Sequence, residues 1–493
     1  MLNKVELQDE ITLWWEKPWK AAAYSAYVRF NGGERVKTEK THCTFSSLAP
    51  DTEYTIEVEF FDGETLIDSE NIVARTAVAK KKIDVTLFGV IGDGKTMNTA
   101  AIQKAADKLK KDEYLYFPKG VYLTGSIAFH DNSEIYLDEG AVIQGSENYK
   151  DYLPKIKVRF EGLETQAYSP LIRAGHMDSK TGQTIENIII RGKGAILGGG
   201  KALCEGVIES EKERLKDYLE ANAEYVKTCE NDRTIPGRAR PFLIDITNTK
   251  NVVVSGLKIG YGAAWNLHIL YSKDISVYGC SFVSQGVWNG DGIDPDSSED
   301  MAIFDCTFET HDDAIAVKSG KNPEGNIINR PMKNLSIFDC RGRNGIALGS
   351  EMSGGIENVY IWDCVIIDSY SGLRAKTTRK RGGYIRNVKV KDCTLTQFKM
   401  FCVPWNDDGE SAGTLPEIKN FEFKNVVFGG YSIAYSGHKT RVPAIEICGF
   451  EDKKENLDNI ILDGVKILLP KNLDNIIIVE NADNVKIENV RYE

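Results

Sequence analysis

The sequence predicts an all-β protein, a right-handed parallel β-helix preceded by a small β-sandwich. Segments of alternating apolar and polar residues recur along the chain between residues 251 and 490, and each begins with Asn or Asp. Alternation with a period of two is typical of strands that bury one face. Repeats of about 20–40 residues indicate a solenoid, in which each coil buries its apolar face on the next. The length fits this architecture, because 493 residues exceed the ~250–300 at which one compact core stops growing.

Residues 1–78 are expected to form the sandwich. They contain three tryptophans and short alternating segments separated by turn residues, which is typical of antiparallel strands. The run from Leu48 to Tyr54, with Pro50 and Thr52 between them, resembles a fibronectin type III module with Tyr54 in the tyrosine-corner position. The lysine-rich residues 79–83 are expected to be a solvated linker, and residues 84–493 to form the β-helix.

The repeats define the coils. Their first residues, aligned on Asn or Asp, are Asn251, Asp274, Asp300, Asn334, Asn358, Asn387, Asn420, Asn459 and Asn484. The sixth position after most of these is apolar and small, and in five coils it is cysteine: Cys280, Cys306, Cys340, Cys364 and Cys393. Because cysteine behaves as a small apolar residue, we expect these five to stack inside the solenoid.

Two helical segments interrupt the strands. Ala-rich residues at about 98–111, with Asn98 or Thr99 as the N-cap, predict a helix that covers the open first coil. Residues at about 203–228 predict a helical insertion over one face. The segment 89–96 also matches the phosphate-binding pattern GxxxxGK[ST], but that motif requires alternating strands and helices downstream. We therefore interpret it as a turn.

Composition excludes several functions. The net charge of −11 and the pI of about 5.3 argue against a nucleic-acid-binding protein. No uninterrupted apolar stretch is long enough to span a membrane, so no membrane partner is expected. The first residues lack the apolar core of a signal peptide, which favours a cytoplasmic location and reduced cysteines.

Acidic residues concentrate on successive predicted coils. Asp291 precedes one strand, and Asp312 and Asp313 precede the next. Equivalent positions of a parallel solenoid lie about 5 Å apart, so these three carboxylates should crowd together in one groove. Crowded carboxylates cannot all ionise freely, and one pKa rises. This division into an acid and a base is what glycoside hydrolysis requires, although clustered carboxylates also suit Ca²⁺.

Cations lie beside the acids. Five of the eight residues from Arg374 to Arg381 are Lys or Arg in an otherwise acidic chain. Arginine can hold a carboxylate through two hydrogen bonds, so this set favours an anionic substrate. No metal or other cofactor is expected.

Four short motifs together resemble glycoside hydrolase family 28, the polygalacturonases, over about residues 82–490. They are Asn289-Gly-Asp291, Asp312-Asp313, Gly342-Arg-Asn344 and Arg374-Ala-Lys376. The resemblance implies a pectin lyase-like β-helix and inversion of configuration. It also implies that Asp313 is the general acid, that Asp291 and Asp312 activate water, and that Asn289, Arg374 and Lys376 bind substrate. Arg343 departs from the histidine of the family.

The resemblance implies an exo-acting polygalacturonase that cleaves α-1,4-linked galacturonate from pectic oligosaccharides. Arg343 and His268 are further candidates for substrate binding, and the helical insertion and the sandwich are expected to close one end of the groove. Three alternatives remain: a related family 28 glycosidase acting on rhamnogalacturonan or another uronate-containing glycan, a Ca²⁺-dependent pectate lyase, and a non-catalytic glycan-binding β-helix. The sequence gives no oligomeric state.

Overall fold

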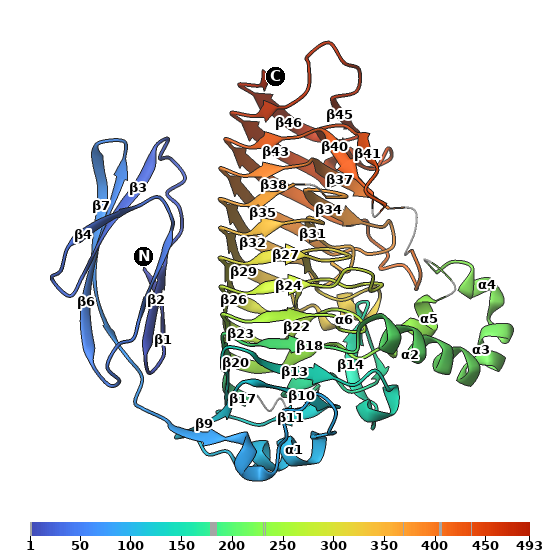
Figure 1. The fold of residues 1–493 in the computed structure, drawn as a ribbon. Helices are drawn as coiled ribbons and strands as arrows, with labels where there is room; N and C mark the ends of the chain where they lie inside the picture. The colour runs from blue at the N-terminus through green and yellow to red at the C-terminus, as the bar shows by residue number, and fades with distance from the viewer. Residues whose placement is uncertain are drawn as a thin grey trace. The chain divides into compact units, whose positions relative to one another are not determined.

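The computed structural model describes all residues except 1, 178–184, 230, 232, 368, 404–406 and 435. The chain forms two compact units. One comprises residues 1–82 and 111–114, and the other comprises residues 83–110 and 115–493. Figure 1 colours the first unit dark blue to blue and the second from blue to red.

The first unit is a small antiparallel β-sandwich, as predicted. One sheet has the order β1 (Asn3–Glu6), β2 (Glu10–Trp14), β5 (His42–Ser46), and the other has the order β4 (Arg35–Thr38), β3 (Tyr24–Phe30), β6 (Glu53–Asp62), β7 (Thr65–Arg75). Ile11 and Leu13 of one sheet and Ile56 and Val58 of the other are all 0% exposed and belong to one apolar core. Alternate residues of facing strands thus form the interior, as expected for a sandwich.

The second unit is a right-handed parallel β-helix built from three long parallel sheets (Figure 1). The third sheet has twelve strands and runs from β10 (Gly120–Thr124) to β47 (Arg491–Tyr492). The other two sheets are named here the site sheet and the ladder sheet. Most coils contribute one strand to each sheet, so successive coils are joined by parallel pairing along the solenoid.

The site sheet has eleven strands. They are, in order, β11 (Ile127–Phe129), β16 (Ile172–Ala174), β19 (Ile244–Thr247), β22 (Leu267–Leu270), β25 (Ile293–Asp296), β28 (Ile315–Val317), β31 (Ile346–Leu348), β34 (Leu373–Thr377), β37 (Phe398–Cys402), β42 (Ile445–Cys448) and β45 (Ile477–Glu480).

The ladder sheet has thirteen strands. They are β8 (Lys81–Asp84), β9 (Glu113–Phe117), β12 (Glu134–Leu137), β17 (Ile185–Gly192), β20 (Thr249–Ser255), β23 (Lys273–Tyr278), β26 (Glu299–Phe304), β29 (Met332–Phe338), β32 (Ile356–Trp362), β35 (Tyr384–Lys391), β38 (Glu417–Lys424), β43 (Leu457–Asp463) and β46 (Asp483–Glu488).

The Asn or Asp that begins each predicted repeat has a left-handed backbone. Their φ angles lie between 49° and 60°, a region that Asn and Asp adopt more readily than other non-glycine residues. Several also pair from coil to coil: the Asn358 side chain donates to Asn334 at 3.0 Å, and Asn387 donates to Asn358 at 3.1 Å. The repeat signal in the sequence therefore marks a backbone bend and a stack of side-chain amides.

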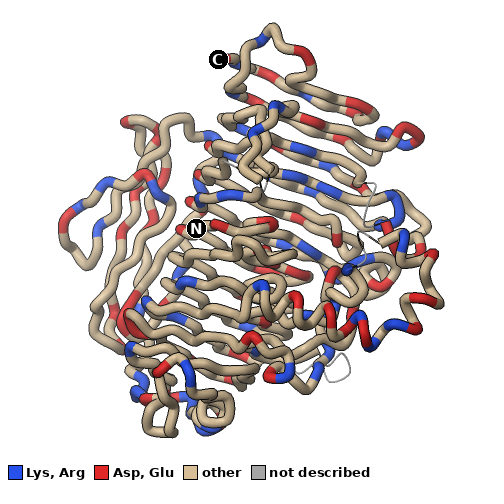
Figure 2. Tube along the Cα trace, turned by 45° about the vertical axis from the view of Figure 1, so that its right-hand side comes forward, with Lys and Arg blue, Asp and Glu red and all other residues tan. Residues whose placement is uncertain are grey.

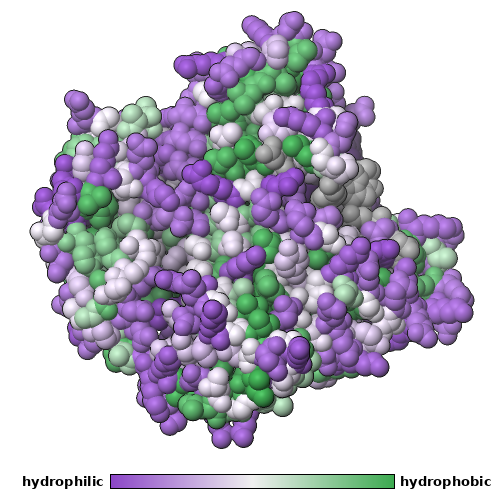
Figure 3. All heavy atoms as spheres, viewed as in Figure 1, coloured by the Kyte–Doolittle hydropathy of each residue, from purple (hydrophilic) through white to green (hydrophobic). Residues whose placement is uncertain are grey.

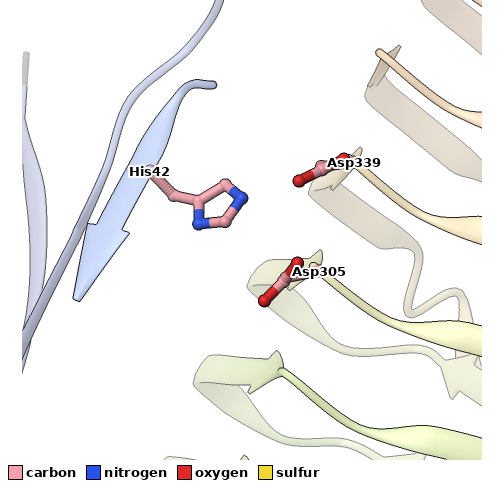
Figure 4. A group of neighbouring side chains, drawn as sticks. All are labelled: His42, Asp305 and Asp339. Carbon is pink, nitrogen blue, oxygen red and sulfur yellow. The ribbon is translucent and has the colours of Figure 1, made fainter. Parts of the chain in front are cut away.

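A second left-handed position ends the ladder-sheet strands. Asp305 follows β26 and Asp339 follows β29, with φ angles of 52° and 46°, and Figure 4 shows the two side chains one coil apart. Equivalent positions in neighbouring coils carry Gly, Asp or Asn, so the same bend recurs along the solenoid.

The five aligned cysteines lie inside the solenoid, as predicted. Cys280, Cys306, Cys340, Cys364 and Cys393 are 0–2% exposed and belong to the apolar core. Later coils carry valine at this register, and Val426 and Val465 are 0% and 1% exposed. Burial raises the pKa of the Cys306, Cys340, Cys364 and Cys393 thiols well above the ordinary value, so these four stay protonated and act as apolar filling.

Both predicted helical segments are present. Helix α1 (Thr99–Lys108) packs beside β11 with Ile102, Ala105 and Ala106 buried, and so covers the first coil. The insertion forms α2 (Gly200–Arg214), α3 (Lys216–Ala221), α4 (Ala223–Val226) and α5 (Thr234–Gly237). In contrast, the predicted linker is not wholly irregular, because its lysines begin strand β8. Lysines are common both in solvated linkers and on exposed edge strands, so composition alone did not distinguish a linker from a strand.

The segment that matches a phosphate-binding loop is a turn organised by its own aspartate. The Asp93 side chain accepts hydrogen bonds from the backbone N–H groups of Lys95 and Thr96, both at 2.8 Å. These bonds lower the pKa of Asp93 to about 2. The donors that would bind a phosphate are therefore already occupied by a carboxylate.

The surface mixes charge and hydropathy. Lys and Arg alternate with Asp and Glu along the coils in Figure 2, and hydrophilic and hydrophobic residues are interspersed on the face in Figure 3. Within the described part of the chain, no helix is long and apolar enough to cross a membrane.

Candidate active site

The outer face of the site sheet carries the charged residues that the sequence singled out. On each strand alternate residues point inward, so Ile293, Ile315 and Leu373 lie in the core while the residues that follow them point outward. On β25 these outward residues include Asp294, and on β34 they are Arg374 and Lys376. Period-two alternation thus places the functional side chains on one face.

The three predicted catalytic carboxylates lie in the turns before β25 and β28, on adjacent coils. The turns are joined by a hydrogen bond of 2.9 Å from the Gly292 N–H to the Asp313 carbonyl. Asp291 and Asp313 are 4% and 3% exposed, and Asp312 is half-buried. One oxygen of Asp312 accepts the N–H of Asp313 at 3.0 Å. The structure therefore brings Asp291, Asp312 and Asp313 together.

Burial raises the pKa of two of these carboxyls. For Asp313, burial is the largest cause, and the nearby cations Arg374 and Lys376 oppose it. For Asp291, burial is again the largest cause, and the like charges of Asp294 and Asp312 add to it. A raised carboxyl pKa is the property expected of a general acid, and at Asp291 the charge of Lys318 opposes the rise.

The cations of β34 flank Asp313. The Arg374 guanidinium donates a hydrogen bond to Asp313 Oδ1, and Arg374 is 9% exposed. Lys376, two residues later, is half-buried and lowers the pKa of Asp313 by its charge. Arg374 thus contacts the predicted acid itself.

The structure places Asn289 and Arg343 at the margin of this cluster. The Asn289 side-chain oxygen accepts a hydrogen bond from Arg240 at 2.6 Å, and the residue is half-buried before the Asp291 turn. The Arg343 side chain is 39% exposed, and its guanidinium lies 3.8 Å from Glu309. Arg343 precedes β31, one coil after the Asp312–Asp313 turn.

His268 is fully buried, next to Asp294 on the neighbouring strand of the site sheet. Its side chain is 0% exposed, and Nδ1 lies 2.7 Å from Asp245 while Nε2 lies 3.6 Å from Asp296. The rings of Phe242 and Trp265 contact it at centroid distances of 4.6 and 5.2 Å. This placement does not support the prediction that His268 contacts substrate, and its partners are instead two buried carboxylates.

A hairpin that the sequence analysis missed covers the earlier coils of the site sheet. It consists of β14 (Ile156–Phe160) and β15 (Leu163–Ala167). Phe160 stacks on Phe242 and on Trp265 at 5.2 Å in both cases. Arg159 forms an ion pair of 2.9 Å with Asp296, and both side chains are 0% exposed. The hairpin is therefore fixed to the outer face by an aromatic stack and a buried charge pair.

The helical insertion is fixed beside this hairpin. Arg238, which follows α5, pairs with Glu161 of the hairpin at 3.0 Å and with Asp408 at 2.7 Å. Asp408 also forms an ion pair with Lys321, which lies in the loop after β28. These contacts connect the hairpin, the insertion and two loops on the site-sheet side.

The sequence analysis also missed Lys318 and Glu351. Lys318 directly follows β28, and Glu351 follows β31. Lys318 could have been found from the alternation in Ile315-Ala-Val-Lys318, which predicts that its side chain points outward. The run Leu373-Arg-Ala-Lys376 has the same pattern and places Lys376 outward in the same way.

A buried pair of carboxylates with a raised pKa, beside cations on a parallel β-helix, is the arrangement expected of a glycoside hydrolase that acts on an anionic sugar chain. The sequence model of glycosyl hydrolases family 28 matches residues 140–467. A second family model, "Rhamnogalacturonase A/epimerase, pectate lyase-like", matches residues 82–153. The chain belongs to glycosyl hydrolases family 28.

Relatives agree with this membership. A probable polygalacturonase of Vitis vinifera is 30% identical over 364 residues, covering 70% of this chain and 68% of the relative. An exo-poly-alpha-D-galacturonosidase of Dickeya chrysanthemi is 25% identical over 459 residues, covering 89% and 75%. The family 28 exopolygalacturonase structure of Yersinia enterocolitica superposes with a TM-score of 0.81 at 22% identity, covering 99% and 98%; this likeness concerns the fold.

Proposed function

We propose that the protein is an inverting, exo-acting polygalacturonase that removes terminal galacturonate from α-1,4-linked pectic oligosaccharides. The observation that carries the proposal is the meeting of Asp291, Asp312 and Asp313 on adjacent coils, beside the cations of β34. The names of the Vitis and Dickeya relatives support galacturonate chains as the substrate.

In this proposal the three carboxylates have two roles. Asp313, whose pKa burial raises, donates a proton to the departing glycosidic oxygen. Asp291 and Asp312 hold and activate the water that attacks the anomeric carbon from the opposite face. Arg374 and Lys376 bind the carboxylate of the sugar, and Arg374 turns from Asp313 toward the substrate.

Exo action follows from what covers the outer face. The hairpin β14–β15 lies over the coils of β22 and β25, where Phe160 stacks on Trp265 and Arg159 pairs with Asp296, and Arg238 after α5 connects the insertion to this hairpin. A chain of sugars crossing those coils would have to displace a buried ion pair and an aromatic stack. The name of the Dickeya relative, an exo-poly-alpha-D-galacturonosidase, supports the same mode of cleavage.

One alternative has a specific observation in its favour. The match of residues 82–153 to the rhamnogalacturonase and pectate lyase-like description favours a backbone of alternating rhamnose and galacturonate as a second candidate substrate. A Ca²⁺-dependent lyase is less consistent, because Lys318 and Arg374 already contact the clustered carboxylates that would bind the cation.

A product screen tests the proposal. Purified protein is incubated with saturated oligogalacturonates of several lengths and with rhamnogalacturonan oligosaccharides, with and without EDTA. We expect galacturonate monomer from the first set, unchanged by EDTA, and no unsaturated product. Release of rhamnose-containing products alone would establish the alternative substrate, EDTA-sensitive unsaturated products would establish a lyase, and no turnover would favour a binding protein.

We propose two further assignments. The N-terminal unit is a fibronectin type III-like module, supported by its strand order and by the Tyr54 hydroxyl, which accepts the Ala49 N–H at 3.0 Å. The protein acts in the cytoplasm, a location supported by ten cysteines that form no disulfide. Fractionation of the source cells tests the second assignment.

A further inference from the structure

Lys318 is a buried cation that faces three carboxylates of the candidate site. Its side chain is 6% exposed, and its ammonium lies 3.3 Å from Asp294 Oδ1, 3.6 Å from Glu351 Oε2 and 4.0 Å from Asp291 Oδ2. The proposed roles of the three catalytic carboxylates do not involve Lys318. Lys318 is therefore the shared cation of a group of three carboxylates, those of Asp291, Asp294 and Glu351.

An aromatic floor isolates Lys318 from solvent. The ammonium lies 4.4 Å from the ring centroid of Trp265, and Trp265 stacks on Phe160 and Phe242 at 5.2 and 5.0 Å. A cation over an indole ring is attracted to its face. The apolar surroundings also lower the local dielectric, which strengthens the interactions between Lys318 and its carboxylates.

The carboxylates themselves have few other partners. Oδ1 of Asp291 and both oxygens of Asp294 make no conventional hydrogen bond within the described part of the chain. A buried carboxylate without hydrogen bonds retains its charge only with a nearby cation. The other charged groups that act on this cluster in the described part of the chain include Asp312, Asp313, His268, Arg374 and Lys376, and Lys321 and Arg381 on the side of Glu351.

We propose that Lys318 is a positioning residue for the hydrolysis, which holds Asp291 and Asp294 as a cation-bound pair so that Asp291 carries the negative charge needed to activate water. Glu351 is the third carboxylate of this group and keeps the ammonium in place. The inference deepens the proposed function and rests on it.

The electrostatic directions agree with this geometry. Burial lowers the pKa of Lys318, but Glu351, Asp294 and Asp291 override it and raise that pKa well above the usual value, so the ammonium stays charged. Burial raises the pKa of Asp291, and Lys318 opposes this rise. Burial also raises the pKa of Glu351, but Lys318 leads the cations that reverse the effect, so Glu351 is anionic.

The test is the acidic limb of the pH–rate profile, where the water-activating carboxylate gains its proton. Lys318→Met removes the cation, so the pKa of Asp291 should rise and the limb should move to higher pH by about one unit or more. Lys318→Arg keeps a cation and should restore most of the wild-type position. Arg191→Met is the matched control: Arg191 is 7% exposed and pairs with Glu134 at 2.8 Å on the ladder sheet, and its loss should leave the limb unmoved.

Two additions keep the test decisive. Glu351→Gln removes a buried anion and should move the acidic limb to lower pH, the opposite direction, even if Lys318→Met fails to fold. Infrared titration of protonated carboxyl groups in wild type and Lys318→Met needs no substrate, and we expect carboxyl protonation at higher pH in the variant. If these substitutions change neither the acidic limb nor the infrared titration, the inference is overturned. If the wild type is inactive but the infrared titration still shifts in the variants, only the proposed function is overturned.

Discussion

At the scale of single residues, the account depends most on Asp313. Asp313→Asn should lower kcat by roughly 10²–10⁴-fold, because the amide cannot donate the proton that a general acid supplies. A sugar with an activated aryl leaving group needs little protonation, so it should partly rescue Asp313→Asn. The same substrate should not rescue Asp291→Asn, which affects the water. Equal behaviour of the two variants on both substrates would contradict the division of roles.

Arg374 couples substrate charge to the acid. In the structure it donates to Asp313 and lowers the pKa of that carboxyl. Arg374→Ala should therefore lower kcat/KM for a uronate roughly ten- to hundredfold, more than for its neutral galactose analogue. It should also raise the pKa of Asp313 and move the alkaline limb upward.

The next coil offers a control for Arg374. Lys399 pairs in register with Arg374 on the following strand and forms an ion pair of 3.1 Å with Glu446. Lys399→Ala should change neither the preference for the uronate nor the alkaline limb. If the two variants behave alike, Arg374 has only a structural role.

His268 makes stability depend on pH. Burial lowers the pKa of His268, but hydrogen bonds with Asp245 and Asp296 outweigh burial and raise it from 6.5 to about 9. Because folding raises the pKa of His268, its protonation stabilises the folded state. This stabilisation is complete below pH 6.5 and is lost as pH rises through about 9, an effect on the order of 3 kcal/mol. His268→Gln should be less stable at pH 6 and lose this alkaline dependence. Denaturant unfolding at several pH values measures it, and a wild-type slope retained by the variant would contradict it.

At the scale of elements, the sequence itself suggests a test of the interior stack. Cysteine fills the inward register of five coils and valine fills it in later coils, so Cys393→Val should change the free energy of unfolding little. Cys393→Ser places a hydroxyl among apolar residues, because Cys393 is 1% exposed, and should cost about 1–3 kcal/mol. Equal stabilities of the two variants in denaturant titrations would show that the register is not apolar.

The coils were predictable and the hairpin was not. Each coil carries a local signal, an Asn or Asp with positive φ followed by alternating residues, so the strands and Cys393 could be placed from sequence. The position of β14–β15 depends instead on contacts distant in sequence, such as Arg159 with Asp296. An alternating segment predicts a strand, but nothing in its residues indicates that it lies on the outer face of another sheet.

At the scale of the whole molecule, stacking converts sequence motifs into one site. Asp291 and Asp313 were predictable because each precedes a coil strand, and parallel pairing brings equivalent turns together. The contacts of Lys318 and the burial of His268 were not predictable, because both depend on the aromatic side chains that cover the sheet. Trp265 contacts both residues, yet its sequence neighbourhood shows no such role.

The central claim is that these carboxylates perform inverting hydrolysis at the end of a galacturonate chain. Proton NMR of an early reaction on an α-1,4-linked oligogalacturonate tests it directly, because the anomeric proton of fresh product reports its configuration before mutarotation. The account predicts β-galacturonate monomer as the first product, together with an oligomer shorter by one residue. Fresh α-monomer, or first products of several lengths from internal cleavage, would contradict it.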